Sequence, residues 1–454
     1  MSGWLSPESL GGLLIAVAVA MVAWRNLYQG VQAFTLLASI PVMQVGAFSG
    51  ANVTQGLMMS EVLAIVLVVA AVLAGEFHVR ATEGVVTPLL AFLGISCVSA
   101  LTGHLWYDPS IDLGHLNVAV SFGQVLLFAL PVGVIIVTAA AITETRQALW
   151  IVRAMQAMTL VQPVMAFVST ETSLYLSWTW SFGLMVAPFS FAEALETQSW
   201  PRKVVLVLLA VAPIGKAFVD GRAFVYLTLA VAFGVVVLLA RGRKAAIPIG
   251  VALCGYLLLV ALSGSWMLKP VESLVDTEVK QQSLGGRTGR GALFEDAVSI
   301  WLAHPIVGVG PGNSYPYMLR YSMIGTPHNQ YANLLLEVGA LGLLAFLEFI
   351  RRALMLGLRT RERVAPDAQW MVTGWIGLFC GLVVGAVAGD FMMHSIRNGG
   401  ILFFTQYYQQ WLLLGMVIAM YRIGTTGTTV RVTQDVRRPA PVPWRRRFET
   451  RPAS

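Results

Sequence analysis

Charged residues are scarce in this sequence: Asp, Glu, Lys and Arg make up only 12% of its 454 residues, against roughly 25% in a soluble domain. Because 57% of the residues are hydrophobic, a soluble globular protein is excluded. Cysteine is also rare, and Cys97, Cys254 and Cys380 each lie inside an apolar run. We therefore expect small core residues at these positions and no disulfide framework or metal site.

Long apolar runs fill most of the chain, and about 20 apolar residues are enough to span a bilayer. The runs lie near 10–24, 31–48, 57–73, 85–105, 118–140, 149–168, 174–195, 204–219, 223–240, 245–267, 331–350, 371–388 and 401–421. The second run is the weakest because Pro41 and Gly46 interrupt it, and whether 31–48 crosses the membrane is left open. The sequence predicts an all-α polytopic integral membrane protein with about 12 transmembrane helices.

Basic residues between the runs predict the orientation, because cytoplasmic loops collect Lys and Arg. The clusters 241–244 and 351–363 and the tail 422–454, with eight Arg against Asp435 and Glu449, are expected in the cytoplasm. Counting one span at a time then puts the stretch 268–330 on the side of the membrane opposite the cytoplasm. The side on which the N-terminus lies is left open.

Two domains follow from this layout. Residues 1–421 are expected to form a transmembrane domain that includes the external loop 268–330, and 422–454 to form a disordered basic cytoplasmic tail held near anionic lipid. The membrane accounts for the basic balance, so no nucleic-acid partner is expected.

The long loop 268–330 carries its own pattern, and long connections in compact proteins are usually functional. Leu293, Ala297, Ile300 and Trp301 recur at helical spacing, which predicts an amphipathic helix over 292–304. The glycines in 308–313 predict a tight turn and not a dinucleotide fingerprint, since no clear strand precedes them.

His328 is the candidate base. Thr326-Pro327 before an apolar run is a helix start signal, with Thr as N-cap and Pro at the first position, which places His328 in the first turn. The positive end of the helix dipole would keep this imidazole neutral and would attract anions. A histidine that only caps or packs at the membrane surface is an equal alternative.

Several arginines are predicted on the same external side. Guanidinium groups clamp phosphate oxygens, so Arg222 and Arg290 can hold a diphosphate, with Arg287 as a further contact to phosphate or glycan. Salt bridges and solvated loop charges are the alternatives. Asp390, His394 and Arg397 can line an acceptor cleft or form a local ion pair. Glu337 lies inside its predicted helix, where a charge is expensive to bury, so it should face protein or water, and an architectural hydrogen bond is expected.

The ordered set of motifs resembles the O-antigen ligase and polymerase superfamily of bacterial membrane proteins. The motifs are Thr288-Gly289-Arg290, a helix with Trp301, 304–310 (HPIVGVG), 328–331 (HNQY) and 334–343 (LLLEVGALGL). They cover the region from about Arg222 to Leu343. Phe294 departs from many relatives, which carry Trp there.

The resemblance implies a metal-independent, inverting glycosyltransferase that needs no cofactor and acts at the periplasmic face of the inner membrane. It takes glycan from undecaprenyl diphosphate and joins it to an acceptor hydroxyl. Carried over by motif, His328 is the catalytic histidine and Arg222 and Arg290 the donor arginines, with Asn329 beside them as a substrate contact.

An O-antigen ligase acting on the lipid A core is the leading hypothesis. A polymerase would use the same donor with a second lipid-linked glycan as acceptor. A lipid-linked oligosaccharide flippase or secondary transporter is the alternative from another class, but it should show repeats or paired broken helices with charges near the midplane. The sequence shows no such repeat, and most charges lie near the ends of the runs.

Overall fold

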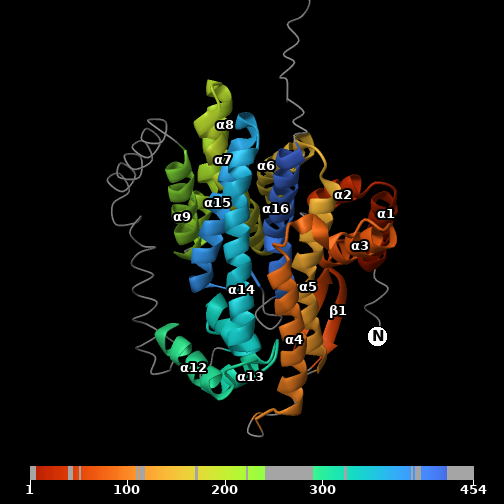
Figure 1. Ribbon diagram of the computed structural model, residues 1–454, viewed down its shortest axis with the longest axis vertical. Helices are drawn as coiled ribbons and strands as arrows, with labels where there is room; N and C mark the ends of the chain where they lie inside the picture. Colours follow the sequence, from red (N-terminus) through yellow and green to blue (C-terminus); the bar gives the residue numbers. More distant parts are fainter. Residues whose placement is uncertain are drawn as a thin grey trace, which may run out of the picture.

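The computed structural model describes residues 7–38, 44–50, 53–108, 111, 118–168, 172–220, 223–240, 290–321, 325–389, 392–393 and 400–426. The long helices run side by side along the length of the molecule, and α12 and α13 close one end of it (Figure 1). The first helices are α1 (Pro7–Arg25), α2 (Leu27–Leu37), α3 (Met59–Leu73), α4 (Thr87–Leu105), α5 (Val118–Ala141), α6 (Thr145–Val168), α7 (Thr172–Glu196), α8 (Trp200–Asp220) and α9 (Ala223–Leu239). The later ones are α12 (Arg290–Ala303), α13 (Ser314–Leu319), α14 (Gln330–Arg363), α15 (Gln369–Gly385) and α16 (Gly400–Thr426), with short 3-10 turns at Val79–Thr82, Pro366–Ala368 and Ala386–Ala388.

The apolar runs became helices, as predicted, because an apolar chain in lipid must satisfy its backbone groups internally. All runs but the second and the tenth coincide with a helix, and the tenth (245–267) lies outside the described residues. Among the described residues, four helices are long and apolar enough to cross a membrane: Thr87–Leu105, Val118–Ala141, Gln330–Arg363 and Pro366–Gly385. The total of about 12 spans and the division into two domains stay predictions, and α16 continues to Thr426, past the expected boundary at 421.

The weak second run does not form one helix. Helix α2 ends at Leu37, after 11 residues, which at 1.5 Å per residue is about 17 Å, too short for a hydrocarbon core of about 30 Å. The strands β1 (Gln44–Gly50) and β2 (Val53–Met58) follow and pair as an antiparallel hairpin. This small hairpin is the exception to the all-α prediction.

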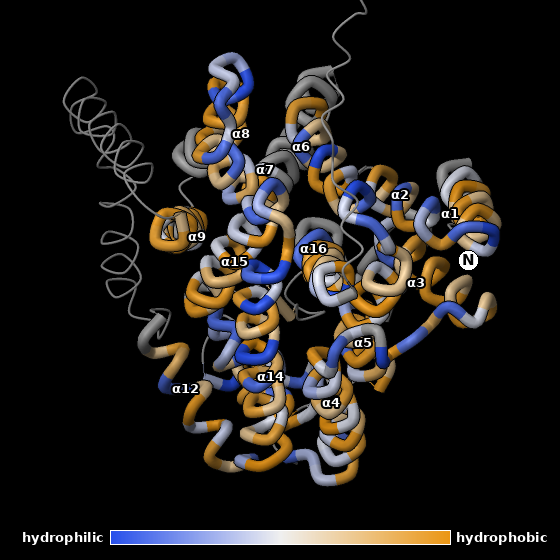
Figure 2. The backbone as a smooth tube through the Cα atoms, turned by 45° about the horizontal axis from the view of Figure 1, so that its top comes forward, coloured by the Kyte–Doolittle hydropathy of each residue, from blue (hydrophilic) through white to orange (hydrophobic). Residues whose placement is uncertain are grey.

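Hydrophobic residues face outward as well as inward. Leu105 and Leu238 are 70% and 83% exposed, and the tube of α9, which contains Leu238, is drawn mostly in the orange of hydrophobic residues (Figure 2). A helix that is apolar on all sides is typical of a membrane span. Cys97 is exposed on α4, so the prediction of a core residue was wrong there, whereas Cys380 is partly buried. Cys254 lies outside the described residues.

Small residues let neighbouring helices approach closely. A Cβ atom added at Gly377 or Gly381 of α15 would lie 2.6 or 2.4 Å from the carbonyl oxygen of Ala232 or Thr228 of α9. These two glycines are four residues apart, so they lie on one face of the helix. This is the spacing by which membrane helices pack closely.

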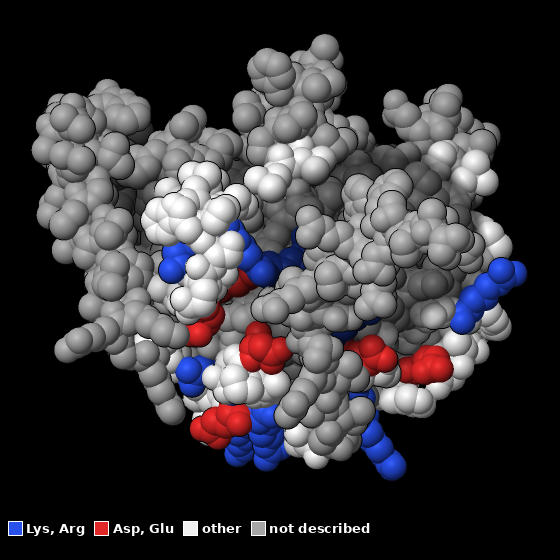
Figure 3. Space-filling model, turned by 90° about the horizontal axis from the view of Figure 1, so that it is seen from above, with Lys and Arg blue, Asp and Glu red and all other residues white. Residues whose placement is uncertain are grey.

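Charged residues gather at the end of the molecule opposite α12 and α13 (Figure 3). Several arginines there bond to backbone carbonyls: Arg361 donates to Leu239 O (2.6 Å) at the end of α9, and Arg352 to Gly84 O (3.0 Å). Arg361 thus satisfies a carbonyl at a helix C-terminus. Arginines of the basic cluster 351–363, which helped to predict the orientation, therefore also bond to the backbone next to other helices.

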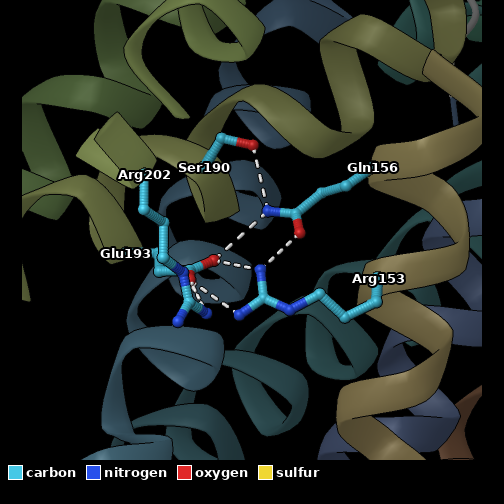
Figure 4. Close-up of polar contacts among 5 residues, drawn as sticks. All are labelled: Arg153, Gln156, Ser190, Glu193 and Arg202. Atoms are coloured by element: carbon cyan, nitrogen blue, oxygen red, sulfur yellow. Dashed lines mark hydrogen bonds and ion pairs between the residues drawn. The ribbon is translucent and has the colours of Figure 1, made fainter. Parts of the chain in front are cut away.

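A buried carboxylate joins α6, α7 and α8 at this end (Figure 4). The Glu193 side chain is only 4% exposed and pairs with both Arg153 and Arg202. Arg153 also donates to Gln156 (2.6 Å), whose amide nitrogen donates to Ser190 (3.2 Å). A buried charge of this kind is stable only when it is paired, so Glu193 ties the three helices together.

Candidate functional site

The helix predicted in the long loop is present, and it packs against a small, separate hydrophobic core. Helix α12 spans Arg290–Ala303 and ends before Pro305, as expected. Its inner side is buried, whereas Phe294 is 47% exposed, so the departure from Trp there does not alter this core. The core contains Ile111, Leu293, Ala297, Ile300, Val309, Tyr317, Met318, Ala332 and Leu336. It fixes α12 and α13 against the start of α14.

Helix α14 is broken at Gly339, and the loop 305–310 fills the break. Gly339 has φ 66° and ψ −170°, which no helix accommodates. Four backbone hydrogen bonds replace the helical ones: Val309 N to Leu336 O (2.8 Å), Gly310 N to Glu337 O (3.0 Å), Ala340 N to Pro305 O (3.0 Å) and Leu341 N to Ile306 O (3.2 Å). In an unbroken helix the amides of residues 340 and 341 would bond to the carbonyls of residues 336 and 337. The loop therefore bonds to both N–H groups and to both carbonyl groups that the break leaves without a helical partner.

We call this replacement of helical hydrogen bonds by bonds to the loop 305–310 the exchange at Gly339. Glycine is required at three of its positions. An added Cβ at Gly308 would lie 2.3 Å from Leu336 O, and one at Gly339 would lie 2.3 Å from Ile306 O. Gly103 of α4 meets Val309 O at the same distance. The predicted tight turn at 308–313 is thus confirmed, with positive φ at Gly308, Gly310 and Gly312.

Buried polar side chains hold the exchanged segments. Glu337 is 1% exposed, and its carboxylate accepts from the Ser314 hydroxyl (2.7 Å), which confirms the expected architectural hydrogen bond. The Ser99 hydroxyl of α4 lies within hydrogen-bond distance of the carbonyls of Val307 and Glu337 (2.6 Å for Glu337). Asn313, fully buried, donates to Val309 O (3.1 Å). Burial of these groups is tolerated because each has a partner.

His328 does not lie in the first turn of α14, and the prediction of Thr326 as N-cap was wrong. The N-cap is Asn329, whose Oδ1 accepts from the backbone N–H of Tyr331 (3.0 Å) and Ala332 (3.1 Å). His328 precedes the cap, is partly buried and has φ 49°. Thr326 accepts from the His328 backbone N–H (3.3 Å) and stabilises this turn. A positive φ is uncommon for residues other than glycine and often marks a functional site.

The start of α14 is fixed to the connection between α15 and α16. The Gln330 amide oxygen accepts from the backbone N–H of Met392 (3.2 Å) and Met393 (2.9 Å), and its nitrogen donates to Met393 O (2.6 Å). Tyr331 donates its hydroxyl proton to Val383 O (2.6 Å). Sequence reasoning missed both contacts: Gln330 and Tyr331 belong to the motif 328–331, but nothing in the sequence indicates which distant backbone groups they reach.

A second polar cluster attaches the loop to the end of α4. Arg320 and Asp108 form an ion pair (2.9 Å), and the Tyr317 hydroxyl accepts from the Asp108 backbone N–H (3.2 Å). His304 packs edge-on against the Tyr317 ring, at 5.7 Å between centroids. Burial lowers the pKa of the His304 imidazole below its ordinary value, although Asp108 opposes the shift. Burial likewise raises the pKa of the Tyr317 phenol.

The other predicted site residues are only partly described. Arg290 begins α12, and its side chain lies outside the described residues. Arg222, Arg287, Asp390 and Arg397 lie outside them altogether, as do His394 and the side chains of Lys216 and Asp220. Of the predicted set, the structure brings together His328 and Asn329 at the start of α14.

The described arrangement offers an imidazole in a strained turn beside a helix N-terminus, on a rigid support. The dipole of the half-helix 330–338 points its positive end toward the turn. Such an end stabilises an anion close to it. The residues can therefore serve proton transfer next to a phosphate-bearing substrate.

The chain matches one known family over a single segment. Residues 204–347 match the family model described as O-antigen ligase. No curated protein matches the chain. The matched segment contains His328, Arg222 and Arg290, together with both halves of the exchange at Gly339. This match over residues 204–347 supports the O-antigen ligase and polymerase superfamily for the chain.

Proposed function

We propose that the protein is an O-antigen ligase of the inner membrane. It would transfer glycan from undecaprenyl diphosphate to a sugar hydroxyl of the lipid A core at the periplasmic face. The observation that carries this proposal is the position of His328, held in a left-handed turn directly before the cap of α14 and inside the matched segment.

His328 is the proposed general base. Its imidazole removes the proton of the acceptor hydroxyl, and the oxygen attacks the anomeric carbon from the face opposite the diphosphate. The bond from that carbon to the diphosphate oxygen breaks, and its electron pair leaves with the diphosphate, so the configuration inverts. The imidazolium then releases its proton to water. A positioned base of this kind contributes about 10²- to 10⁴-fold.

Arg222 and Arg290 are the proposed donor residues. Charge develops on the leaving diphosphate, and guanidinium groups stabilise it there. Arg290 begins α12, whose core packs directly against the first turns of α14. The support of the base and the support of one donor arginine are therefore the same small core.

The exchange at Gly339 bears on the transporter alternative. A transporter would use broken helices to expose backbone groups to a substrate or an ion. Here the backbone groups freed at the break bond to the loop 305–310. The break thus serves to hold the loop, which favours an enzyme.

A transfer assay tests the proposal. Protein in nanodiscs is given lipid-linked donor and lipopolysaccharide core, and His328→Ala is expected to lose at least about 10²-fold in turnover. The exposed His78, between α3 and the turn Val79–Thr82, provides the matched control His78→Ala. Full turnover in His328→Ala would remove the proposed base.

Donor use and the acceptor are tested separately. Arg222→Ala and Arg290→Ala should weaken donor use by about 10- to 150-fold, the value of one charge-assisted hydrogen bond. Arg351→Ala is the control, because the Arg351 side chain is 62% exposed and pairs with Glu348 of the same helix.

In a deletion strain, loss of all capped core indicates a ligase, core with a single repeat indicates a polymerase, and a normal lipopolysaccharide ladder rejects both.

A further inference from the structure

We propose that Gln330 is a positioning residue that fixes the connection between α15 and α16 to the start of α14, and thereby sets the acceptor side of the site. This inference rests on the proposed function for its ligand, a hydroxyl-bearing glycan acceptor. Gln330 itself does not touch the reacting atoms.

The contacts of Gln330 use both ends of its amide. The oxygen accepts two backbone N–H groups, from Met392 (3.2 Å) and Met393 (2.9 Å), and the nitrogen donates to Met393 O (2.6 Å). Gln330 and Met392 are fully buried, and Met393 is 2% exposed. The side chain therefore binds the donor and the acceptor of one residue, as a neighbouring strand would.

The three hydrogen bonds of Gln330 to Met392 and Met393 are called the clamp below. The clamp links the segment that carries the candidate base to the connection between α15 and α16. Gln330 is the first residue of α14 and follows His328 by two positions, which limits their separation to about 7 Å along the chain. Asp390 is two positions before Met392 in sequence, so the same limit applies there. A shift of the clamp therefore shifts the predicted acceptor residues relative to the base.

The donor side depends on other segments. Arg222 follows α8, and Arg290 begins α12, which the small core holds against α14. Loss of the clamp should thus affect the acceptor and leave the donor unaffected. If Gln330 had a merely structural role, its loss would change the kinetic constants for the donor and for the acceptor alike.

Two variants of Gln330 and a matched control test this inference. Gln330→Leu removes all three hydrogen bonds, and Gln330→Glu keeps the two accepted ones but, when ionised, has no N–H for Met393 O. Gln409→Leu makes the same change at a Gln of α16 that is 1% exposed and whose amide has no hydrogen-bond partner among the described residues. Steady-state kinetics are measured with donor and acceptor varied in turn, together with hydrogen exchange at the Met392 and Met393 amides.

In Gln330→Leu we expect faster exchange at both amides and a loss of about 10²-fold in kcat/KM for the acceptor, the effect of misplacing a reacting group by about 1 Å. The donor KM should stay unchanged. Gln330→Glu should fall between Gln330→Leu and the native protein, and Gln409→Leu should match the native protein. If Gln330→Leu does not fold, Gln330→Glu decides the question by the same two measurements.

An equal rise in both KM values, or native kinetics despite faster exchange, would overturn the positioning role. Native exchange rates at Met392 and Met393 would show that the clamp does not hold the connection. Failure of the proposed function gives a different result: His328→Ala would then stay active, or the native protein would transfer no glycan, and the exchange rates would still report on the clamp.

Discussion

Replacement of Gly339 by Ala is the most direct perturbation of the site's support. Gly339 separates the half-helix 330–338 from the rest of α14, and its backbone angles (φ 66°, ψ −170°) are strained for any residue with a Cβ. An added Cβ would also lie 2.3 Å from Ile306 O. Gly339→Ala should therefore expel the loop 305–310 from the break.

The size of the effect follows from two terms. A non-glycine residue in this region of φ and ψ costs about 1–3 kcal/mol. Ala also favours a continuous helix over Gly by about 1 kcal/mol. The four exchanged hydrogen bonds contribute little net difference, because straightening of α14 restores two helical bonds and releases the loop groups to water. The sum is about 2–4 kcal/mol, or about 30- to 1,000-fold, in favour of the unbroken helix.

Hydrogen exchange and glycan transfer measure this shift. The amides of Val309 and Gly310, bonded to Leu336 and Glu337 in the native protein, should exchange faster in Gly339→Ala by up to the same factor. Transfer activity should fall with them, since Ala332 and Leu336 of the half-helix belong to the core that supports α12. Gly94→Ala in α4 is the control, because nothing lies within 4 Å of its added Cβ and its φ is not positive.

Native exchange at Val309 and Gly310 together with native activity in Gly339→Ala would refute the reasoning. It would mean that the break tolerates a Cβ and that the approach of Ile306 O is not a constraint. A loss of similar size in Gly94→Ala would also refute it, because the effect would then be that of any glycine substitution.

Three further predictions concern other parts of the molecule. Because burial lowers the pKa of His304, the folded state favours the neutral ring, so stability should fall as the pH drops below about 6.5; thermal unfolding of His304→Gln should show a smaller dependence on pH. Glu193→Gln should cost about 2 kcal/mol in thermal or denaturant unfolding, less than a fully buried pair because the Arg153 side chain is 32% exposed; an unchanged midpoint would contradict the tie. Asn329→Ala should cost about 1 kcal/mol as a lost N-cap, while Asn329→Asp should keep the cap; a stable but inactive Asn329→Asp would assign the residue to substrate as well.

Much of the helical fold was predictable, because apolar runs must satisfy their backbone groups within helices in lipid. The loop helix was predictable for the same kind of reason: Leu293, Ala297 and Ile300 repeat at helical spacing, and all three are buried. The hairpin at 44–58 was missed because its side-chain pattern is weak beside the apolar runs. The pairing of Glu193 with Arg153 was missed because it joins two helices, and neither apolar run indicates which residues of the other it faces.

The start of α14 shows how two valid local signals compete. Thr326-Pro327 and Asn329 are both suitable beginnings of a helix, but Asn is at least as good an N-cap as Thr. Asn329 accepts from two backbone N–H groups of the first turn. Thr326 then bonds to the His328 N–H instead, and His328 takes the positive φ that joins the two. A sequence pattern cannot rank these choices, since the strain at His328 depends on the surrounding packing.

The exchange at Gly339 could not be predicted from local patterns, because it joins residues about thirty positions apart. Its signal lies in the two glycines: Gly308 approaches the carbonyl of Leu336, and Gly339 approaches that of Ile306, each at 2.3 Å from the missing Cβ. Each motif therefore supplies the glycine that the other's backbone requires. It follows that 304–310 and 334–343, which lie apart in the sequence, form one structural unit, and that a change in either should move the segment that carries His328.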